Sequence, residues 1–297
     1  MSIFTGAGVA ICTPFYEDGK FNQEVYGKLI DFQIKNGIDA IISCGTTGEA
    51  STLSNDEHVE VVRAAVEFAK AGNRKVPVIA GGGGNDTNNI IMLGQKLQKI
   101  GVDALMLVTP YYNKTSQRGL IEHFTKVAAQ VDLPIILYNV PVRTSLNMLP
   151  KTIERLAKIE NIVGVKEASA DISQIAEVIE RCGDNLSVYS GNDDHVVPVL
   201  SLGGRGVIST IANIAPQQMH DMVMKYLDGN VKESAKMQHE MNPLVRALFM
   251  DVNPMPVKTA LNLMGFGAGP CRLPLTDIDD PLKATLISRM KDYGLLS

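Results

Sequence analysis

Short apolar runs alternate with longer amphipathic segments along most of this chain. Eight of the runs are too short for helices and are rich in β-branched residues, so each predicts a buried strand. They recur roughly every twenty to thirty-five residues, at residues 8–13, 40–43, 76–80, 104–108, 135–138, 162–166, 187–190 and 206–209.

The segments between these runs have helical periodicity. Ser54 and Glu57 have the spacing of a capping box, and apolar residues then recur at helical intervals through residues 61–69. Asp171 followed by Gln174 predicts a second helix start of the same kind. A strand followed by a helix, repeated eight times, is the pattern of a (β/α)8 TIM barrel.

An internal repeat supports this prediction. Residues 36–42 and 100–106 both contain a Gly that ends a helix and an Asp that leads into a strand, and Asp39 and Asp103 lie 64 residues apart, or two β–α units. A doubly wound open sheet is the competing architecture. Eight strand candidates without a dinucleotide-binding fingerprint make it the weaker one. Residues 81–84, four glycines, match no nucleotide-binding loop and predict a close-approach turn.

The chain changes character after residue 209. Residues 216–227, 231–250, 256–264 and 281–293 have helical apolar spacing, and no further strand is predicted. The first of these segments completes the barrel as its eighth helix. We therefore expect a barrel at residues 1–228 and a C-terminal helical extension at residues 229–297 that packs on it, because no Pro-, Gly- or Ser-rich linker separates the two.

The composition is that of a soluble globular protein, with 45% apolar and 20% charged residues. A net charge of −4 offers no electrostatic footprint for nucleic acid or an anionic membrane. The chain shows no signal-peptide pattern and no apolar stretch long enough to cross a bilayer, so we expect a cytoplasmic protein. Cys12, Cys44, Cys182 and Cys271 form no CxxC motif, which predicts buried thiols and neither a zinc site nor disulfides.

Lys166 ends the sixth predicted strand. In a (β/α)8 barrel the carboxyl ends of the strands meet at one mouth, where catalytic residues gather. A primary amine among apolar neighbours pays a desolvation cost for its charged form, and the neutral amine is the form that attacks a carbonyl to make a Schiff base. The alternative is a lysine that reaches solvent past the strand end.

Other predicted strands also end in polar residues. The second strand leads into Gly45-Thr46-Thr47-Gly48-Glu49, whose hydroxyl and N–H groups suit a carboxylate, and the fourth leads to Tyr111 and Tyr112. Tyr138 and Arg143 follow the fifth. Each alone has an ordinary structural explanation, such as a common turn, a core ring or a surface guanidinium. Their joint placement at one mouth favours a functional site.

No metal site is predicted. Asp193, Asp194 and His195 match neither a calcium loop nor a zinc spacing, and the same holds for Asp277, Asp279 and Asp280. We expect helix capping from the first group and a solvated loop for the second.

The complete set of motifs resembles that of the dihydrodipicolinate synthases, a family of pyruvate-dependent Schiff-base lyases of the class I aldolase type. The resemblance covers essentially the whole chain and implies the same barrel with a C-terminal helical region. It also implies the condensation of pyruvate with L-aspartate 4-semialdehyde in the diaminopimelate route to lysine. The motifs that carry it are Gly45-Thr46-Thr47-Gly48-Glu49, Tyr111-Tyr112, Tyr138-Asn139-Val140-Pro141 with Arg143, Val165-Lys166-Glu167 and Gly206-Val207-Ile208-Ser209.

The resemblance assigns roles by position. Lys166 would form a covalent imine with pyruvate, so no cofactor and no metal would be needed. Thr46 and Thr47 would hold the pyruvate carboxylate, and Gly191 and Ile208 would line the same site. Tyr138 would be the general acid and base, linked through Thr47 to Tyr112 of a neighbouring subunit. A homotetramer built as a dimer of dimers is therefore implied.

Arg143 would bind the carboxylate of the semialdehyde, because a guanidinium binds a carboxylate through two hydrogen bonds. The family commonly has Gly where this chain has Val142 and Ser145, so we expect the turn around Arg143 to differ.

The resemblance also implies an allosteric lysine site. Its residues here would be Ala50, Ser51, Asn55, His58, Asn85, Asn89 and Tyr111. Lysine-inhibited members often have an acidic residue in place of Asn89 and a His in place of Asn55. The loss of a carboxylate partner for the lysine ammonium predicts weak or absent feedback.

Two alternatives stay open at this point. A related Schiff-base aldolase, such as N-acetylneuraminate lyase or a 2-keto-3-deoxy sugar-acid aldolase, would use the same lysine with another acceptor. Arg143 and the Thr46-Thr47 pair argue against the first, which typically has Ser-Thr and an apolar residue at those places. A non-catalytic barrel that binds a keto acid is the alternative from another functional class.

Overall fold

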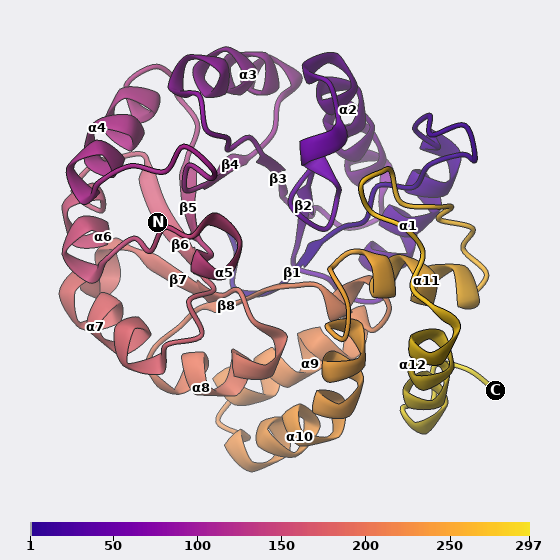
Figure 1. Cartoon of the computed structure of the whole chain (residues 1–297). Helices are drawn as coiled ribbons and strands as arrows, with labels where there is room; N and C mark the ends of the chain where they lie inside the picture. Colours follow the sequence, from indigo (N-terminus) through magenta and orange to yellow (C-terminus); the bar gives the residue numbers. More distant parts are fainter. Residues whose placement is uncertain (1) are drawn as a thin grey trace.

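The structure is a computed structural model that describes residues 2–297, and it contains a closed barrel of eight parallel strands (Figure 1). Neighbouring strands follow the order of the sequence, and β8 pairs with β1 to close the barrel. The strands are β1 (Gly6–Ala10), β2 (Ala40–Ser43), β3 (Val78–Gly81), β4 (Ala104–Val108), β5 (Ile135–Asn139), β6 (Ile162–Glu167), β7 (Ser187–Ser190) and β8 (Gly206–Ser209).

Eight helices form the outer ring, one after each strand. They are α1 (Gln23–Lys35), α2 (Asn55–Ala71), α3 (Thr87–Ile100), α4 (Gln117–Ala128), α6 (Pro150–Leu156), α7 (Ile172–Cys182), α8 (Val196–Ser201) and α9 (Pro216–Leu227). The capping box predicted at Ser54 and Glu57 is present at the start of α2, and Asp171 caps α7 by accepting from the Gln174 N–H. The predicted TIM barrel is confirmed.

The boundary of the first strand was predicted wrongly. Residues 8–13 were expected to be extended, but β1 spans Gly6–Ala10. The Cys12 N–H leaves the sheet and donates to Asn213 Oδ1 at 2.9 Å. This side chain replaces the neighbouring strand as the hydrogen-bond partner, which ends the ladder early.

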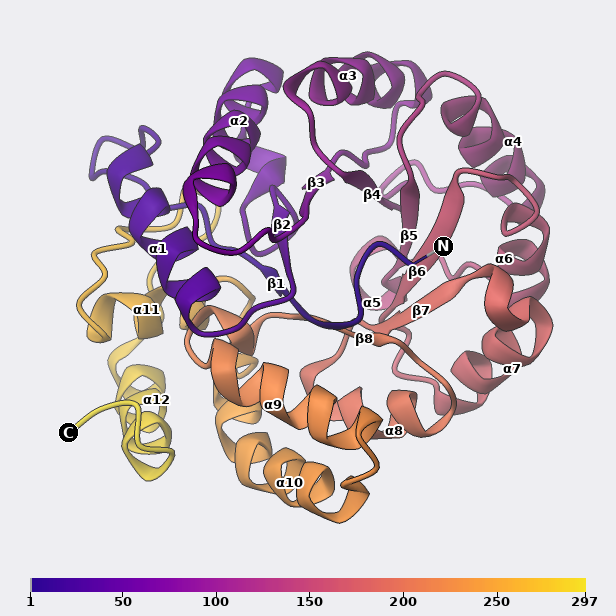
Figure 2. The ribbon, with the colours of Figure 1, turned by 180° about the vertical axis from the view of Figure 1, so that it is seen from behind.

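Alternate strand residues separate the core into two layers. In β2, Ile41 belongs to the cluster between the sheet and the helices, whereas Ile42 belongs to a smaller cluster inside the barrel. At the end of the barrel where the strands begin, Phe4 stacks on Tyr189 with ring centroids 4.4 Å apart. The N-terminal segment crosses this end of the barrel (Figure 2), so the opposite end is the open mouth.

Residues 81–84 make the close approach that the sequence predicted. A Cβ at Gly81 would lie 2.1 Å from the carbonyl oxygen of Cys44, and one at Gly83 would lie 2.3 Å from the Val108 nitrogen. Neither contact is possible for a larger residue, so glycine lets the loop after β3 pack against the ends of its two neighbours.

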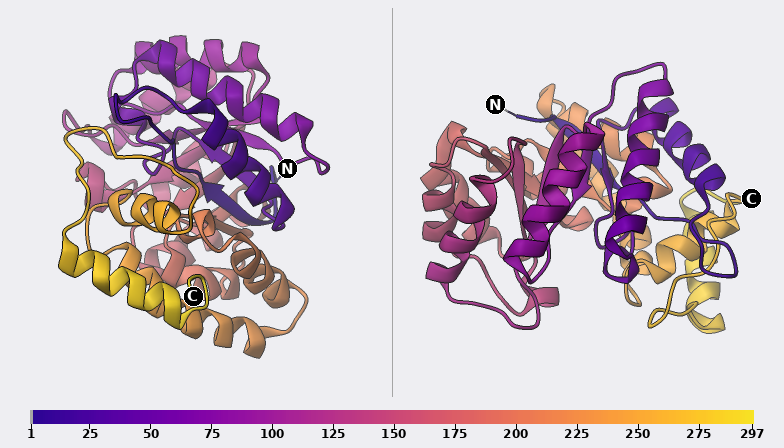
Figure 3. Two further views of the ribbon diagram at one scale, coloured as in Figure 1. Left: turned by 90° about the vertical axis from the view of Figure 1, so that its right-hand side faces the viewer. Right: turned by 90° about the horizontal axis from the view of Figure 1, so that it is seen from above.

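The C-terminal region consists of α10 (Val231–Leu248), α11 (Met255–Leu263) and α12 (Asp280–Asp292). α10 packs on α9 and α12, and the three helices lie together on one side of the barrel (Figure 3). The division into residues 1–228 and 229–297 stays a prediction. No helix in residues 2–297 has both the length and the apolar character that crossing a bilayer requires.

Two groups of acidic residues form hydrogen bonds to backbone N–H groups. The expected capping by Asp193, Asp194 and His195 is not found, because no side chain in residues 2–297 caps the helix α8 that follows them. Asp193 Oδ2 instead accepts the N–H groups of Thr210 and Ile211 at 3.0 and 2.9 Å, at the start of a distant 3₁₀ turn. Asp277 and Asp279 lie in an exposed loop, as predicted, whereas Asp280 begins α12. Asp279 caps α12 and accepts from the Leu282 N–H at 2.9 Å, because the acidic residues stand immediately before a helix start.

Candidate active site

Lys166 and Tyr138 are direct neighbours at the mouth of the barrel. They occupy paired positions near the carboxyl ends of β6 and β5, and Lys166 Nζ lies 4.5 Å from the centre of the Tyr138 ring. Both side chains are buried, with exposed fractions of 5% and 6%. The adjacent strands therefore hold an amine and a phenol side by side.

The surroundings of Lys166 differ from those of the other buried lysine. Lys258 Nζ forms an ion pair with Glu49 Oε1 at 2.7 Å, and both side chains are almost completely buried. No ion pair among residues 2–297 includes Lys166. Lys166 is thus a buried amine that no carboxylate binds in an ion pair, which leaves its nitrogen free to act as a nucleophile.

Two buried carboxyl groups lie near Lys166. Glu167 follows it in β6 and accepts hydrogen bonds from Asn139 Nδ2 and from the Ser169 N–H, and Asp193 follows β7. Burial raises the pKa of both carboxyls, and their hydrogen bonds oppose this shift. The positive charge of Lys166 also opposes the shift at Asp193.

The Glu167 hydrogen bond joins β5 and β6 one residue beyond the Tyr138–Lys166 pair. Asn139 and Glu167 are themselves paired in the register of the sheet, and Asn139 Nδ2 lies 3.1 Å from both carboxylate oxygens. This contact fixes the ends of the two strands relative to each other, and with them the two side chains at the mouth.

Thr46 and Thr47 lie in a tight loop that follows β2. The Glu49 N–H bonds to the Thr46 carbonyl at 3.1 Å, and the hydroxyl of Thr13 donates to the Gly48 carbonyl at 2.7 Å. Thr47 is buried, and its Oγ1 accepts from Asn253 Nδ2 at 2.9 Å. The structure contains no hydrogen bond between Thr47 and Tyr138 within residues 2–297.

Arg143 belongs to α5 (Pro141–Thr144), a single helical turn directly after β5. Its side chain is exposed at the mouth, and Nη2 donates to the Asn253 carbonyl at 3.2 Å. Ser145 has φ = +53°, in the left-handed region that glycine normally occupies. The chain thus forms a left-handed turn at Ser145 without glycine. The side chain at the other expected glycine position, Val142, is 87% exposed.

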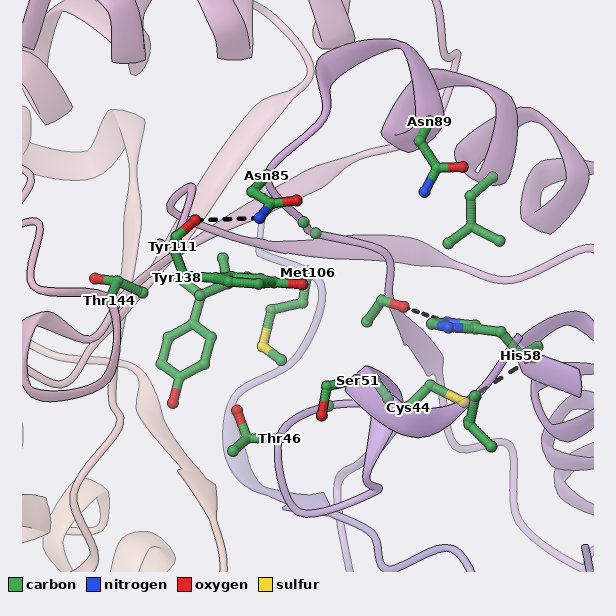
Figure 4. A pocket seen from close by; sticks show the side chains of 18 of the residues that line it. Cys44, Thr46, Ser51, His58, Asn85, Asn89, Met106, Tyr111, Tyr138 and Thr144 are labelled. Carbon is green, nitrogen blue, oxygen red and sulfur yellow. Dashed lines mark hydrogen bonds between the residues drawn. The ribbon is translucent and has the colours of Figure 1, made fainter. Parts of the chain in front are cut away.

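A cavity of about 360 Å³ opens beside these residues (Figure 4). Thr46, Tyr138 and Arg143 line it. Lys166 and Thr47 are buried and do not line it, but Lys166 contacts the ring of the lining residue Tyr138. The cavity therefore gives access to the region around the lysine from the side of the tyrosine.

Gly191 follows β7 and Ile208 lies in β8. The Gly191 N–H donates to the Glu167 carbonyl at 2.7 Å, and a Cβ at this position would lie 2.6 Å from the Ala168 Cβ. Only glycine fits there without a shift of β6. Ile208 is buried in the same interior cluster as Tyr138. The two predicted residues therefore lie at the next two strands of the barrel after β6.

Tyr112 is not brought to this site by its own chain. It is 92% exposed and has φ = +68°, an unusual backbone conformation for an aromatic residue. The single chain therefore brings the other predicted catalytic and binding residues to the mouth and leaves the second tyrosine outside.

All seven residues of the expected allosteric site line the same cavity as Tyr138. Asn55 Nδ2 donates to Asn89 Oδ1 at 2.8 Å, and Asn85 Nδ2 donates to the Tyr111 carbonyl at 3.2 Å. Burial lowers the pKa of His58, whose Nε2 bonds to the Gly81 carbonyl. This end of the cavity is therefore lined mainly by neutral polar groups.

The sequence did not point to Asn253, Glu49 or Lys258. Asn253 contacts both Thr47 and Arg143, although 206 and 110 residues separate them in the chain. The only local signal was an Asn-Pro pair between two predicted helices, which marks a turn and nothing more.

Comparisons with known proteins identify the family. The family model described as the dihydrodipicolinate synthetase family matches residues 3–292. The chain belongs to this family, as its motifs predicted. It is 55% identical to the 4-hydroxy-tetrahydrodipicolinate synthase of Lachnoclostridium phytofermentans, over the whole of both chains.

Solved structures agree with this assignment. The dihydrodipicolinate synthase of Thermotoga maritima is similar with a TM-score of 0.96 and 41% identity, over 99% of this chain and 100% of that one. The enzyme of Cyanidioschyzon merolae, solved with lysine bound, has a TM-score of 0.96 and 38% identity over the whole of both chains.

Proposed function

We propose that this chain is a 4-hydroxy-tetrahydrodipicolinate synthase that condenses pyruvate with L-aspartate 4-semialdehyde. The observation that carries the proposal is the buried amine of Lys166, which has no ion-pair partner in residues 2–297 and lies 4.5 Å from the Tyr138 ring. The neutral form of an amine attacks the keto group of pyruvate to form an imine, and no carboxylate in an ion pair holds this one back.

The first half of the reaction forms and activates the imine. Lys166 Nζ bonds to the keto carbon of pyruvate, and the keto oxygen leaves as water after it is protonated. The iminium group then withdraws electrons, so the pyruvate methyl group loses a proton and an enamine results. Tyr138 is the acid and base for these transfers, because its ring packs next to the amine.

The second half joins the two substrates. The enamine carbon attacks the aldehyde carbon, and the aldehyde oxygen takes a proton. The amino group of the semialdehyde then displaces Lys166 from the imine carbon, which closes the ring and frees the enzyme. No external electron acceptor is required, because the imine serves as the electron sink.

The residues around the mouth suit the two acids. Thr46 and Thr47 offer hydroxyl and N–H donors to the carboxylate of pyruvate, in a loop that backbone hydrogen bonds hold rigid. Arg143 is exposed at the mouth, and its guanidinium suits the carboxylate of the semialdehyde.

A substrate panel tests the proposal. Purified protein should consume pyruvate with aspartate 4-semialdehyde and show far lower kcat/KM with N-acetylmannosamine or a sugar-derived aldehyde. Arg143→Lys should raise the KM for the semialdehyde more than the KM for pyruvate, because it loses the bidentate contact. A preference for N-acetylmannosamine would instead assign a related aldolase.

We further propose that the active form is a homo-oligomer, in which Tyr112 reaches the site of a second copy. An almost fully exposed aromatic side chain on a left-handed backbone is costly unless something uses it. A homotetramer built as a dimer of dimers would provide that contact. We place the reaction in the cytoplasm, as suits a biosynthetic enzyme with two small polar substrates.

Feedback by lysine is predicted to be weak or absent. Asn55 and Asn89 bond to each other and provide no carboxylate for a lysine ammonium, which should weaken binding by roughly 1.5–3 kcal/mol. Initial rates measured against lysine should show little inhibition at micromolar concentrations. Asn89→Glu should lower the inhibitory concentration by about tenfold or more. Half-inhibition of the unaltered protein by micromolar lysine would contradict the prediction.

A further inference from the structure

Four polar side chains form a cluster behind the barrel mouth: Asn139, Asn147, Glu167 and Gln174. Asn139 follows Tyr138 in β5, and Glu167 follows Lys166 in β6. Because side chains alternate between the two faces of a strand, Asn139 and Glu167 point toward the outer helices and away from the barrel interior. Both are completely buried. No role in the reaction has been assigned to either of them.

The orientation of the Asn139 amide is fixed by a backbone group. Its Oδ1 accepts the Met148 N–H at 2.9 Å, and a reversed amide would turn its NH2 group against that N–H. Nδ2 is therefore the donor, and it lies 3.1 Å from both oxygens of Glu167 and 2.8 Å from Asn147 Oδ1. One amide thus links β5 to β6 and to the segment that follows Arg143.

Asn147 connects the cluster to the outer helices. It exchanges two hydrogen bonds with Gln174 of α7, at 2.7 and 3.1 Å, and its backbone carbonyl accepts from Gln117 Nε2 of α4 at 2.8 Å. Every side-chain nitrogen and oxygen of the four clustered residues has a hydrogen-bond partner. A fully satisfied buried network is rigid, whereas the loss of one member leaves buried groups unpaired.

Glu167 is the member of the cluster that an amide could not replace. Its oxygens are both acceptors, and Oε1 also receives the Ser169 N–H at 2.8 Å. A glutamine would turn an NH2 group toward the NH2 group of Asn139. No ion pair within residues 2–297 includes Glu167, and a buried charge without a cation is costly. What the carboxylate provides is a rigid connection between two adjacent strand ends.

We propose that Asn139 and Glu167 are positioning residues, whose hydrogen bonds hold the Lys166 amine and the Tyr138 phenol in the relative position that the proton transfers of imine formation require. The sheet carries the effect, because Tyr138–Lys166 and Asn139–Glu167 are successive pairs in the register of β5 and β6. The inference rests on the proposed function. Neither positioning residue lines the cavity, so neither touches substrate.

Glu167→Gln tests the proposal with a side chain of the same size. It places a donor against the Asn139 donor, so kcat should fall about two- to tenfold, the effect expected for one neutral hydrogen bond. The rate at which pyruvate and borohydride label Lys166 should fall by a similar factor, because imine formation uses the same amine and phenol. The KM for the semialdehyde should stay within about twofold, because Arg143 is outside the cluster. A kcat equal to that of the unaltered protein would overturn the proposal.

A matched pair of variants separates positioning from stability. Asn139→Ala removes the link and should lower kcat tenfold or more. Asn161 stands at the other end of β6, where its Nδ2 donates to the carbonyls of Ala128 and Val131 at 3.0 and 3.1 Å. Asn161→Ala should lower the melting temperature and leave kcat within about twofold. Equal losses of kcat in the two variants would indicate general destabilisation and would overturn the proposal.

A double-mutant comparison tests whether the cluster acts through Tyr138. In a Tyr138→Phe background, Glu167→Gln should change the remaining kcat by less than about twofold, because no phenol is left to position. An undiminished effect in that background would contradict the proposal. This comparison uses only substitutions that keep the shape of the side chain, so it does not depend on the folding of Asn139→Ala.

The outcomes also separate this inference from the proposed function. A protein that neither consumes pyruvate with the semialdehyde nor forms a pyruvate adduct on Lys166 would contradict the function itself. An active, adduct-forming protein in which Glu167→Gln and Asn139→Ala keep their kcat would contradict only the role of these two residues.

Discussion

Two buried lysines in this molecule have opposite surroundings and therefore opposite roles. Lys258 pairs with Glu49 and lies 4.2 Å from the Phe15 ring, so its charge is stabilised. Lys166 is also buried, lies over a tyrosine ring and has no carboxylate in an ion pair with it within residues 2–297. Burial alone does not make a lysine reactive, and the missing partner is what distinguishes Lys166.

The hydroxyl of Tyr138 is the second group that the account depends on. Tyr138→Phe keeps the ring that packs beside Lys166 and removes the proton donor. We expect kcat to fall roughly 10²- to 10⁴-fold, the usual contribution of a general acid or base. The melting temperature should change little, because no hydrogen bond of this hydroxyl lies within residues 2–297. A kcat within a factor of two of the unaltered protein would remove Tyr138 from the mechanism.

The residues at strand ends could be predicted from the sequence because barrel topology brings such positions together. Lys166, Tyr138, Thr46 and Arg143 were found in this way, since each follows a strand that its apolar pattern reveals. Asn253 was not found. Its contacts arise from how a loop outside the barrel folds back over the mouth, and no local pattern encodes that.

At the scale of elements, helix α2 is joined to the C-terminal region by Glu57 and Arg272. Arg272 Nη2 donates to Glu57, and its remaining donors bond to the carbonyls of Gly19 and Thr52 at 2.8 Å. The hydrogen bond from Arg272 is the main reason that the pKa of Glu57 is lowered to about 2.

This ion pair predicts a loss of stability in acid. The pKa of Glu57 is near 4.5 when the chain is unfolded and about 2 when it is folded. Its stabilisation is therefore present above pH 4.5 and is lost as the pH falls toward 2. Glu57→Gln should flatten the decrease of the melting temperature between these two pH values.

A neighbouring carboxylate provides the control for that measurement. The Asp56 side chain is 94% exposed, and Asp56→Asn should leave the decrease of the melting temperature in acid unchanged. If the melting temperatures of Glu57→Gln and the unaltered protein decrease identically in acid, the Glu57–Arg272 pair does not link the C-terminal region to the barrel.

Secondary structure was the level at which the sequence was most informative. Four strands match their predicted bounds residue for residue, because each is a buried run between polar turns. β1 was displaced because the side chain of Asn213, from a distant turn, replaces its hydrogen-bond partner. A local sequence pattern does not predict the end of a strand when a side chain from a distant part of the chain sets that end.

At the scale of the whole molecule, the C-terminal helices are part of the structure that holds the site. The Lys258–Glu49 pair is buried and connects α11 to the loop after β2. Removal of one partner from a buried pair leaves the other charge without compensation. The barrel and the C-terminal region should therefore unfold together.

Lys258→Met tests this connection. It leaves the Glu49 carboxylate buried without its partner and should lower the free energy of unfolding by about 3–5 kcal/mol. The double variant Lys258→Met with Glu49→Gln should recover part of that loss, because both charges are then absent. Denaturant unfolding measures both values. A loss below about 1 kcal/mol for the single variant would mean that the pair does not stabilise the fold.

Reductive trapping tests the central claim, the covalent capture of pyruvate by Lys166, most directly. The protein is incubated with pyruvate and borohydride, and the adduct is located by mass spectrometry of peptides. The account predicts one reduced pyruvyl group on Lys166, none on Lys258, and no adduct in Lys166→Ala. An adduct that persists in Lys166→Ala, or an unaltered protein that gains no mass, would contradict it.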